Sequence, residues 1–248
     1  MHALPLRARS VGEVLDAGFQ LFRSGWTSMA AATLILVSPV LLLLLFVSAE
    51  TSVFLGALAN LFFLAASAAT VLIASEAYHG RELSALPAVK QALRRFLSVW
   101  GAAIIQGFLI GLGVLLLIIP GVIAMALTFG IQPAVMVEGR SAGDAFTRSR
   151  KLAQDSLKHI LAVIVVAFLM VGLATVAGGF LSGLLGLSGK VALLADYAVP
   201  VLANPLSACI TTALYYDMRI RKEAYDMQVM TADLDEDDAT QVQPAHTY

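Results

Sequence analysis

Charged residues are scarce in this sequence. Asp, Glu, Lys and Arg together make up 13% of the 248 residues, whereas hydrophobic residues make up 59% and the mean hydropathy is +0.83. An ordinary soluble domain carries about 25% charged residues, so a chain of this composition would expose too much apolar surface in water. The composition therefore predicts a protein whose solvent is a lipid bilayer.

Cysteine and clustered metal ligands are also scarce. The single cysteine, Cys209, lies in an apolar run, so it has no partner for an intramolecular disulfide and none at metal-ligand spacing. The sequence contains no Gly-rich phosphate-binding loop, and its basic segments are short and border apolar runs. We therefore expect no metal, no cofactor and no nucleic-acid partner.

Long apolar runs are present in place of these features. Six of them approach or exceed the 20 or so residues that a helix needs to cross the hydrocarbon core. They are Thr27–Ala49, Val53–Ser75, Val99–Ile119, Gly121–Val137, His159–Leu185 and Asp196–Tyr216. Pro120 and Gly121 separate the third run from the fourth and predict a tight reversal there. We expect an all-α polytopic membrane protein with six transmembrane helices over residues 1–228, followed by an acidic, disordered tail over 229–248.

The cations predict the orientation of these spans. Fifteen of the 16 Lys and Arg residues lie in alternate connections, and Lys190 is the exception. By the positive-inside rule, those connections and both termini face the cytoplasm.

A cationic amphipathic segment precedes each pair of spans. The first and third of these segments match in residue type at four aligned positions. The matching positions are Arg9, Ser10, Gly12 and Glu13 in the first segment, and Arg140, Ser141, Gly143 and Asp144 in the third. The pattern predicts three copies of an interfacial helix followed by a two-span hairpin. The alternative is that these segments are ordinary cationic connectors of a multispan protein.

Three stretches carry a family resemblance: Gly12–Asp16, Pro133–Gly139 continued through Arg148, and Leu214–Glu223 continued to Asp226. They resemble signatures of the membrane-domain family named after glycerophosphoryl diester phosphodiesterase, over roughly residues 9–228. In the fused members of that family, hydrolysis belongs to a separate soluble barrel, for which this chain has no room. The resemblance therefore implies a multi-pass membrane module of the bacterial inner membrane that is not an enzyme.

Ionisable residues gather at the predicted cytoplasmic boundary. Glu138 ends the fourth span, Asp217 ends the sixth, and Arg148 lies in the third interfacial segment. The full set is Glu138, Arg148, Asp217, Arg219, Arg221 and Lys222. We expect these side chains to form a carboxylate–guanidinium network that holds the third interfacial helix against the sixth span. The alternative is a site for a ligand or a partner.

Amide side chains lie deeper in the spans, at Asn60, Gln106, Gln132 and Asn204. Single amides in spans most often hydrogen-bond between helices, and the alternative is that they line a substrate path. Two glycine pairs, Gly107 with Gly111 and Gly179 with Gly183, have the spacing of close helix packing.

These features predict a non-enzymatic scaffold or accessory subunit, with lipids and partner proteins as its contacts at the cytoplasmic face. A small transporter or flippase is the competing hypothesis, and a membrane-embedded lipid enzyme is a third.

Overall fold

The computed structural model describes residues 7–44, 46 and 49–223, and every regular element in them is an α-helix. Six of the helical segments are long and apolar enough to cross a membrane, so the prediction of an all-α polytopic membrane protein is confirmed. The end of the predicted 1–228 domain and the acidic segment 229–248 lie outside the described residues.

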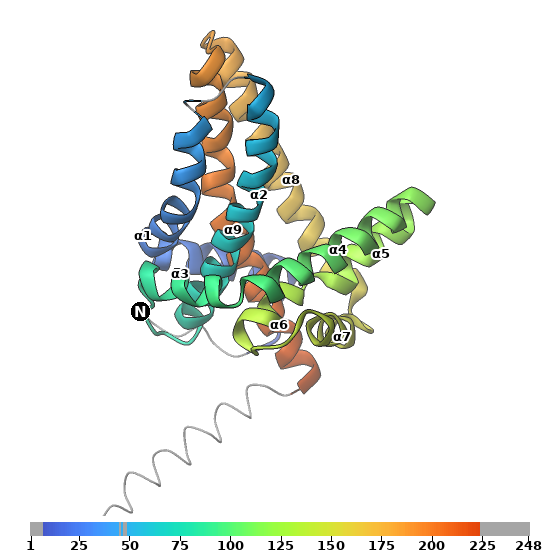
Figure 1. Ribbon diagram of the computed structural model, residues 1–248. Coiled ribbons are helices and arrows are strands. Elements are labelled where there is room, and N and C mark those ends of the chain that lie inside the picture. The colour runs from blue at the N-terminus through green and yellow to red at the C-terminus, as the bar shows by residue number, and fades with distance from the viewer. Residues whose placement is uncertain (1–6, 45, 47–48, 224–248) are drawn as a thin grey trace, which may run out of the picture.

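Four long helices form an upright bundle (Figure 1). They are α1 (Val11–Leu44), α2 (Ala49–Tyr78), α8 (Leu157–Leu184) and α9 (Gly189–Glu223). Helix α2 is the most enclosed of them, because α1 and α9 pack against it and α3, α4 and α6 contact its lower part. Its Ala-rich stretch Ala65–Ala69 is largely buried, and small side chains of this kind let neighbouring backbones approach closely.

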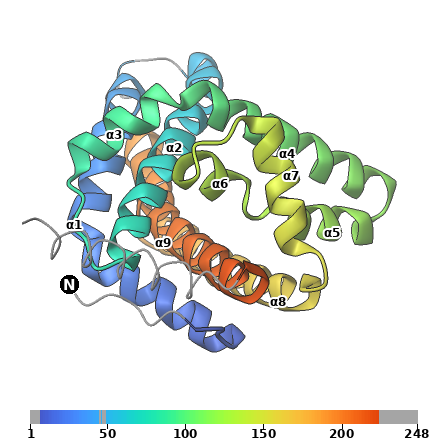
Figure 2. The same cartoon turned by 90° about the horizontal axis from the view of Figure 1, so that it is seen from below.

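The first predicted interfacial segment is part of α1. The early part of this helix runs along one end of the bundle, and the rest rises beside α2 (Figures 1 and 2). Ser24 and Gly25 favour such a bend, because the Ser24 hydroxyl donates to the Leu21 carbonyl within the helix. The interfacial segment is therefore continuous with the first span, whereas the second and third copies are separate helices.

Helices α4 (Phe96–Leu116) and α5 (Ile118–Thr128) form a hairpin that diverges from the bundle (Figure 1). We call this hairpin the arm. Its chain reversal lies at Leu117, which has extended backbone angles, so the prediction of a reversal at Pro120 and Gly121 is wrong by three residues. Pro120 lies in the first turn of α5, where a helix needs no N–H donor.

Glycine has a different role in the arm from the one its spacing predicts. A Cβ on Gly113 would lie 2.7 Å from the Gly121 backbone, so these two glycines permit the close crossing of α4 and α5. By contrast, a Cβ on Gly107 or Gly111 would meet no described atom within 4 Å, and the same holds for Gly179 and Gly183. The predicted close packing at those two pairs is absent from the described residues.

The fourth predicted span, 121–137, consists of two helices. Helix α5 ends at Thr128, and a short helix α6 (Ile131–Val137) follows after Phe129 and Gly130. The hydroxyl of Ser149, from α7 (Ala142–Ala153), accepts a hydrogen bond from Gly130 N at 3.0 Å and donates to Leu127 O at 2.8 Å. One side chain therefore satisfies a backbone donor and a backbone acceptor that the break in the helix leaves unpaired.

A layer of short helices closes one end of the bundle (Figure 2). We call this layer the base, and it comprises α3 (Ala85–Arg94), α6, α7 and residues 215–223 of α9. Arg95, between α3 and α4, donates to the Val135 carbonyl of α6 at 3.3 Å. The base is thus a connected structure at the end of the bundle where the predicted boundary residues lie.

Candidate functional site

Glu138 is the centre of the first of two charged clusters in the base. It follows the last residue of α6, and it receives hydrogen bonds from Arg148 of α7, from the Tyr215 hydroxyl of α9 and from Arg140. Arg148 is bidentate: its Nε lies 3.0 Å from Glu138 Oε2, and its Nη2 lies 2.8 Å from Glu138 Oε1. This fork geometry is the strong form of a carboxylate–guanidinium pair.

Arg148 also binds a second carboxylate. Its Nη2 lies 2.7 Å from Oε2 of Glu223, in the last turn of α9, and its Nη1 contacts the other oxygen of that group. Arg219 lies one helical turn before Glu223, and its Nε is 3.5 Å from Glu223 Oε2 and 3.8 Å from Glu138 Oε1. Helices α6, α7 and α9 therefore meet in one set of ion pairs, which we call the Glu138 cluster.

Partial burial strengthens the pairing in this cluster. The side chains of Glu138 and Arg148 are each 13% exposed. Burial by itself raises the pKa of Glu138, but the hydrogen bonds from its guanidinium and phenol donors outweigh that effect and hold the pKa at about 2, below its ordinary value of 4.5. Hydrogen bonds to Glu223 and Glu138 raise the pKa of Arg148, against the opposing effect of burial. Both groups are therefore charged at neutral pH.

Asp217 is the centre of the second cluster, and its side chain is fully buried. Its carboxylate accepts hydrogen bonds from the backbone N–H of Arg9 at 2.6 Å and from Arg221 Nε at 2.9 Å. The ring Nε2 of His159, at the start of α8, lies 3.1 Å from Asp217 Oδ2, the oxygen that Arg221 also binds. The Asp217 cluster thus joins the segment that precedes α1 to α8 and α9.

Aromatic side chains extend this cluster toward α2. The Arg9 guanidinium donates to the Tyr78 hydroxyl at 2.7 Å, and Tyr78 stacks on Tyr216 with 4.4 Å between ring centroids. The Tyr216 hydroxyl lies 2.7 Å from Ser75 Oγ. Arg9 is only 4% exposed, so its charge is held inside the protein by these partners.

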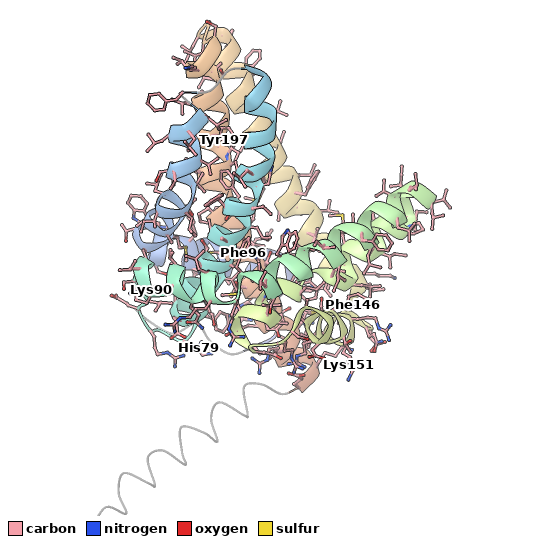
Figure 3. The ribbon with its side chains drawn as sticks, viewed as in Figure 1. His79, Lys90, Phe96, Phe146, Lys151 and Tyr197 are labelled. Carbon is pink, nitrogen blue, oxygen red and sulfur yellow. The ribbon has the colours of Figure 1, made fainter. Side chains whose placement is uncertain are left out.

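The six boundary residues that the sequence singles out therefore fall into separate groups. Glu138, Arg148 and Arg219 share one cluster, and Asp217 and Arg221 share the other. Lys222 belongs to neither cluster, because its ammonium binds Asp155 in the exposed α7–α8 connection at 2.7 Å. In Figure 3, side-chain nitrogen atoms gather at the base, around the labelled His79 and Lys151.

Sequence reasoning missed several participants, among them Tyr215, Glu223, Arg9 and His159. Tyr215, Arg219 and Glu223 are spaced four residues apart, as are Asp217 and Arg221, so helical periodicity places the two sets on different faces of α9. That spacing is a signal for the first two missed residues. Arg9 and His159 carry no such signal, because they lie at the ends of other helices.

Three of the four amides hydrogen-bond between helices. Gln132 of α6 accepts from Ser67 of α2 at 2.9 Å, and Asn204 of α9 donates to the Phe63 carbonyl of α2 at 3.2 Å. Gln106 of α4 lies 3.4 Å from the Thr128 carbonyl of α5. Among the residues that the structure describes, Asn60 bonds only within its own helix, to the Gly56 carbonyl at 2.9 Å. The contacts of Gln132, Asn204 and Gln106 therefore connect neighbouring helices, whereas that of Asn60 does not.

A cavity of about 270 Å³ lies between the arm and the bundle. Its walls are mainly apolar, and of the four amides only Gln106 lines it. It therefore does not connect the amides into a polar path.

A search of family models, curated proteins and solved structures finds no match to this chain.

Proposed function

We propose that this chain is a non-enzymatic integral membrane protein, a scaffold or accessory subunit whose base faces the cytoplasm and contacts anionic lipid headgroups and partner proteins. We further propose the bacterial inner membrane as its location and membership of the membrane-domain family that the sequence resembles. Both clusters in the base, where the family-like motifs of α6, α7 and α9 meet, are built around motif residues, Glu138 and Asp217.

The observation that carries the proposal is a division among the cations of the base. Arg148, Arg219 and Arg221 are paired with carboxylates and fix the helices to one another. Lys90, Arg94 and Lys151, on α3 and α7, are exposed, and none of them has an ion-pair partner within the described residues. A rigid layer that presents unpaired cations beside a membrane suits contact with anionic headgroups.

The polar groups inside the spans support this proposal over transport. A transporter needs polar groups that line a path, whereas Gln132 and Asn204 each bond to α2. Within each cluster, the ionisable groups bind one another, and none of them lines the cavity. We therefore place the contacts of this protein on its surface.

Lipid retention tests the proposal. The full chain is extracted in mild detergent from membranes that contain phosphatidylglycerol, and native mass spectrometry counts the phospholipids that remain bound. Replacement of Lys90, Arg94 and Lys151 by Gln should reduce the number of anionic lipids retained by the protein. The matched control is the triple replacement of Gln20, Gln91 and Gln154 by Asn, which are exposed neutral residues of α1, α3 and the α7–α8 connection.

Two outcomes contradict the proposal. Equal retention of anionic lipid by the variant that lacks Lys90, Arg94 and Lys151 would contradict the proposed headgroup role of these cations. Flux of a solute or lipid through proteoliposomes that depends on Gln106 or Gln132 would favour the transport hypothesis. Crosslinking in native membranes, with the base as the site of attachment, then identifies the protein partners.

A further inference from the structure

The space between the arm and the bundle differs from an ordinary packing defect. Its volume of about 270 Å³ compares with the 10–15 Å³ or so that a single water needs. Side chains from four helices line it, namely α4, α5, α8 and α9, and each of these belongs to a segment long and apolar enough to span a membrane. In Figure 1 the arm leaves the bundle at an angle, on the side of α8.

Hydrocarbon suits this cavity better than water does. Most of its wall is formed by side chains such as Met125 of α5, Ile164 of α8 and Phe168 of α8. A buried water needs two to four polar partners, whereas the polar side chains here are Gln106, which already contacts the Thr128 carbonyl, and two hydroxyl residues of α9. In a membrane, the liquid that borders such a cavity is lipid.

Chain connectivity brings a cation near the break in the helix that borders the cavity. Phe129 lines the cavity, and the residues on either side of it, Thr128 and Gly130, form the break between α5 and α6. Ser149 of α7 is hydrogen-bonded to this break through Gly130 N and Leu127 O. The next residue, Arg150, is exposed, and no carboxylate among the described residues pairs with it. A guanidinium at this position suits a lipid phosphate.

We propose that this cavity binds one acyl chain of a phospholipid from the leaflet beside the base, with the phosphate of that lipid against Arg150. This inference goes beyond the proposed function, because it concerns one site between helices and does not depend on the exposed cations of α3. The occupant is a phospholipid because an apolar cavity with an exposed cation on the neighbouring helix complements a chain and a headgroup together.

Photolabelling of the full chain in nanodiscs tests this site. The probe is a phosphatidylglycerol with a diazirine in the middle of one acyl chain, and mass spectrometry maps the residues that it labels. We expect adducts on half-buried cavity residues from three helices: Met125, Ile164 and Thr211. Labels confined to Leu173 and Val176, which are 68% and 71% exposed on the outside of α8, would overturn the proposal.

A pair of Ala→Phe variants on α8 makes the test specific. Ala167→Phe fills the cavity and should lower labelling of Met125 and Thr211 by about tenfold. Ala174 lies on the same face of α8 two turns later, is exposed and does not line the cavity, so Ala174→Phe should leave that labelling unchanged. If Ala167→Phe does not fold, Ser207→Phe blocks the cavity from α9.

Arg150→Gln tests the headgroup part of the site, and it should lower labelling of the cavity residues by about threefold while leaving labels on Leu173 unchanged. Labelling of Met125 and Thr211 that persists in both Phe variants would overturn the proposal. So would crosslinks that join Met125 to a second copy of the chain, because a protein segment would then occupy the cavity. Reduced lipid retention in the Lys90, Arg94 and Lys151 variant bears on the proposed function alone.

Discussion

Arg148 binds Glu138 through two nitrogens, with Nε 3.0 Å and Nη2 2.8 Å from the two carboxylate oxygens, and with its remaining nitrogen it reaches Glu223. One side chain of α7 thus connects α6 to α9. Because this guanidinium is 13% exposed, its loss leaves two carboxylates without their main partner.

We expect Arg148→Ala to lower the free energy of unfolding by about 2 kcal/mol, since removal of one partner from a largely buried pair leaves charge without compensation. Thermal unfolding in detergent and the level of protein in membranes measure this loss. The control is Arg94→Ala, an exposed arginine of α3 that should change stability by less than about 0.5 kcal/mol. Normal abundance of the Arg148 variant would show that the pair is not a structural connection.

The Glu138 cluster predicts a dependence of stability on pH. The pKa of Glu138 in the folded protein is about 2, below its ordinary value of 4.5, so this carboxylate stabilises the fold fully above pH 4.5. As pH falls from 4.5 toward 2, the unfolded chain takes up the proton first and that contribution is lost. Melting curves from pH 7 to pH 3 should therefore fall more steeply for the wild type than for Glu138→Gln. Parallel curves would contradict the assignment.

Asp217→Ala should lower the free energy of unfolding more than the replacement of an exposed carboxylate does. It removes the acceptor of the Arg9 N–H and of Arg221 from a site that is fully buried, and we expect a loss of about 3 kcal/mol. The matched control is Asp16→Ala, an exposed carboxylate of α1. Similar melting temperatures for the two variants would show that the Asp217 cluster does not hold the start of α1 in place.

The close crossing of α4 and α5 predicts that stability depends on the glycine at position 113. Gly113→Ala brings a methyl group to 2.7 Å from the Gly121 backbone, so it should separate α4 from α5 and lower stability by about 1–3 kcal/mol. Gly111→Ala, two residues earlier on the same helix, meets open space and should leave stability unchanged or raise it. Melting temperatures in detergent compare the two, and equal effects would argue against a tight crossing.

Orientation is testable with introduced cysteines. Ser188→Cys lies in the connection between α8 and α9, at the end of the bundle opposite the base, and Lys151→Cys lies in α7. If the base faces the cytoplasm, a membrane-impermeant maleimide labels the first variant in intact cells and the second only after permeabilisation. Native Cys209 is fully buried and should add no background. The reverse pattern would invert the topology.

The spans were predictable because they depend on local composition. Long apolar runs and the alternation of cations are properties of windows of about 20 residues, and the structure contains six suitable helical segments. The break between α5 and α6 was not predictable in the same way. It depends on the Ser149 hydroxyl, which lies 19 residues beyond Gly130 and is invisible to any hydropathy window.

The boundary residues illustrate the same limit. The sequence places Glu138, Arg148 and Asp217 at the predicted cytoplasmic boundary. That placement gives only their position along the membrane normal. Whether two such groups meet also depends on the helix face that each occupies and on which helix lies opposite. The four-residue spacing of Tyr215, Arg219 and Glu223 predicts that they share one face of a helix. Which helix lies opposite that face is known only from the fold.

The divergent arm also determines the outline of the protein in the plane of the membrane. Near the base, the cross-section includes the upright bundle and the arm, whereas toward the far end only the four bundle helices continue (Figure 1). The described part of the molecule is therefore wider beside the base than at the far end of the bundle. If the six segments span a bilayer, the protein displaces more lipid from the leaflet that contains the arm than from the opposite leaflet.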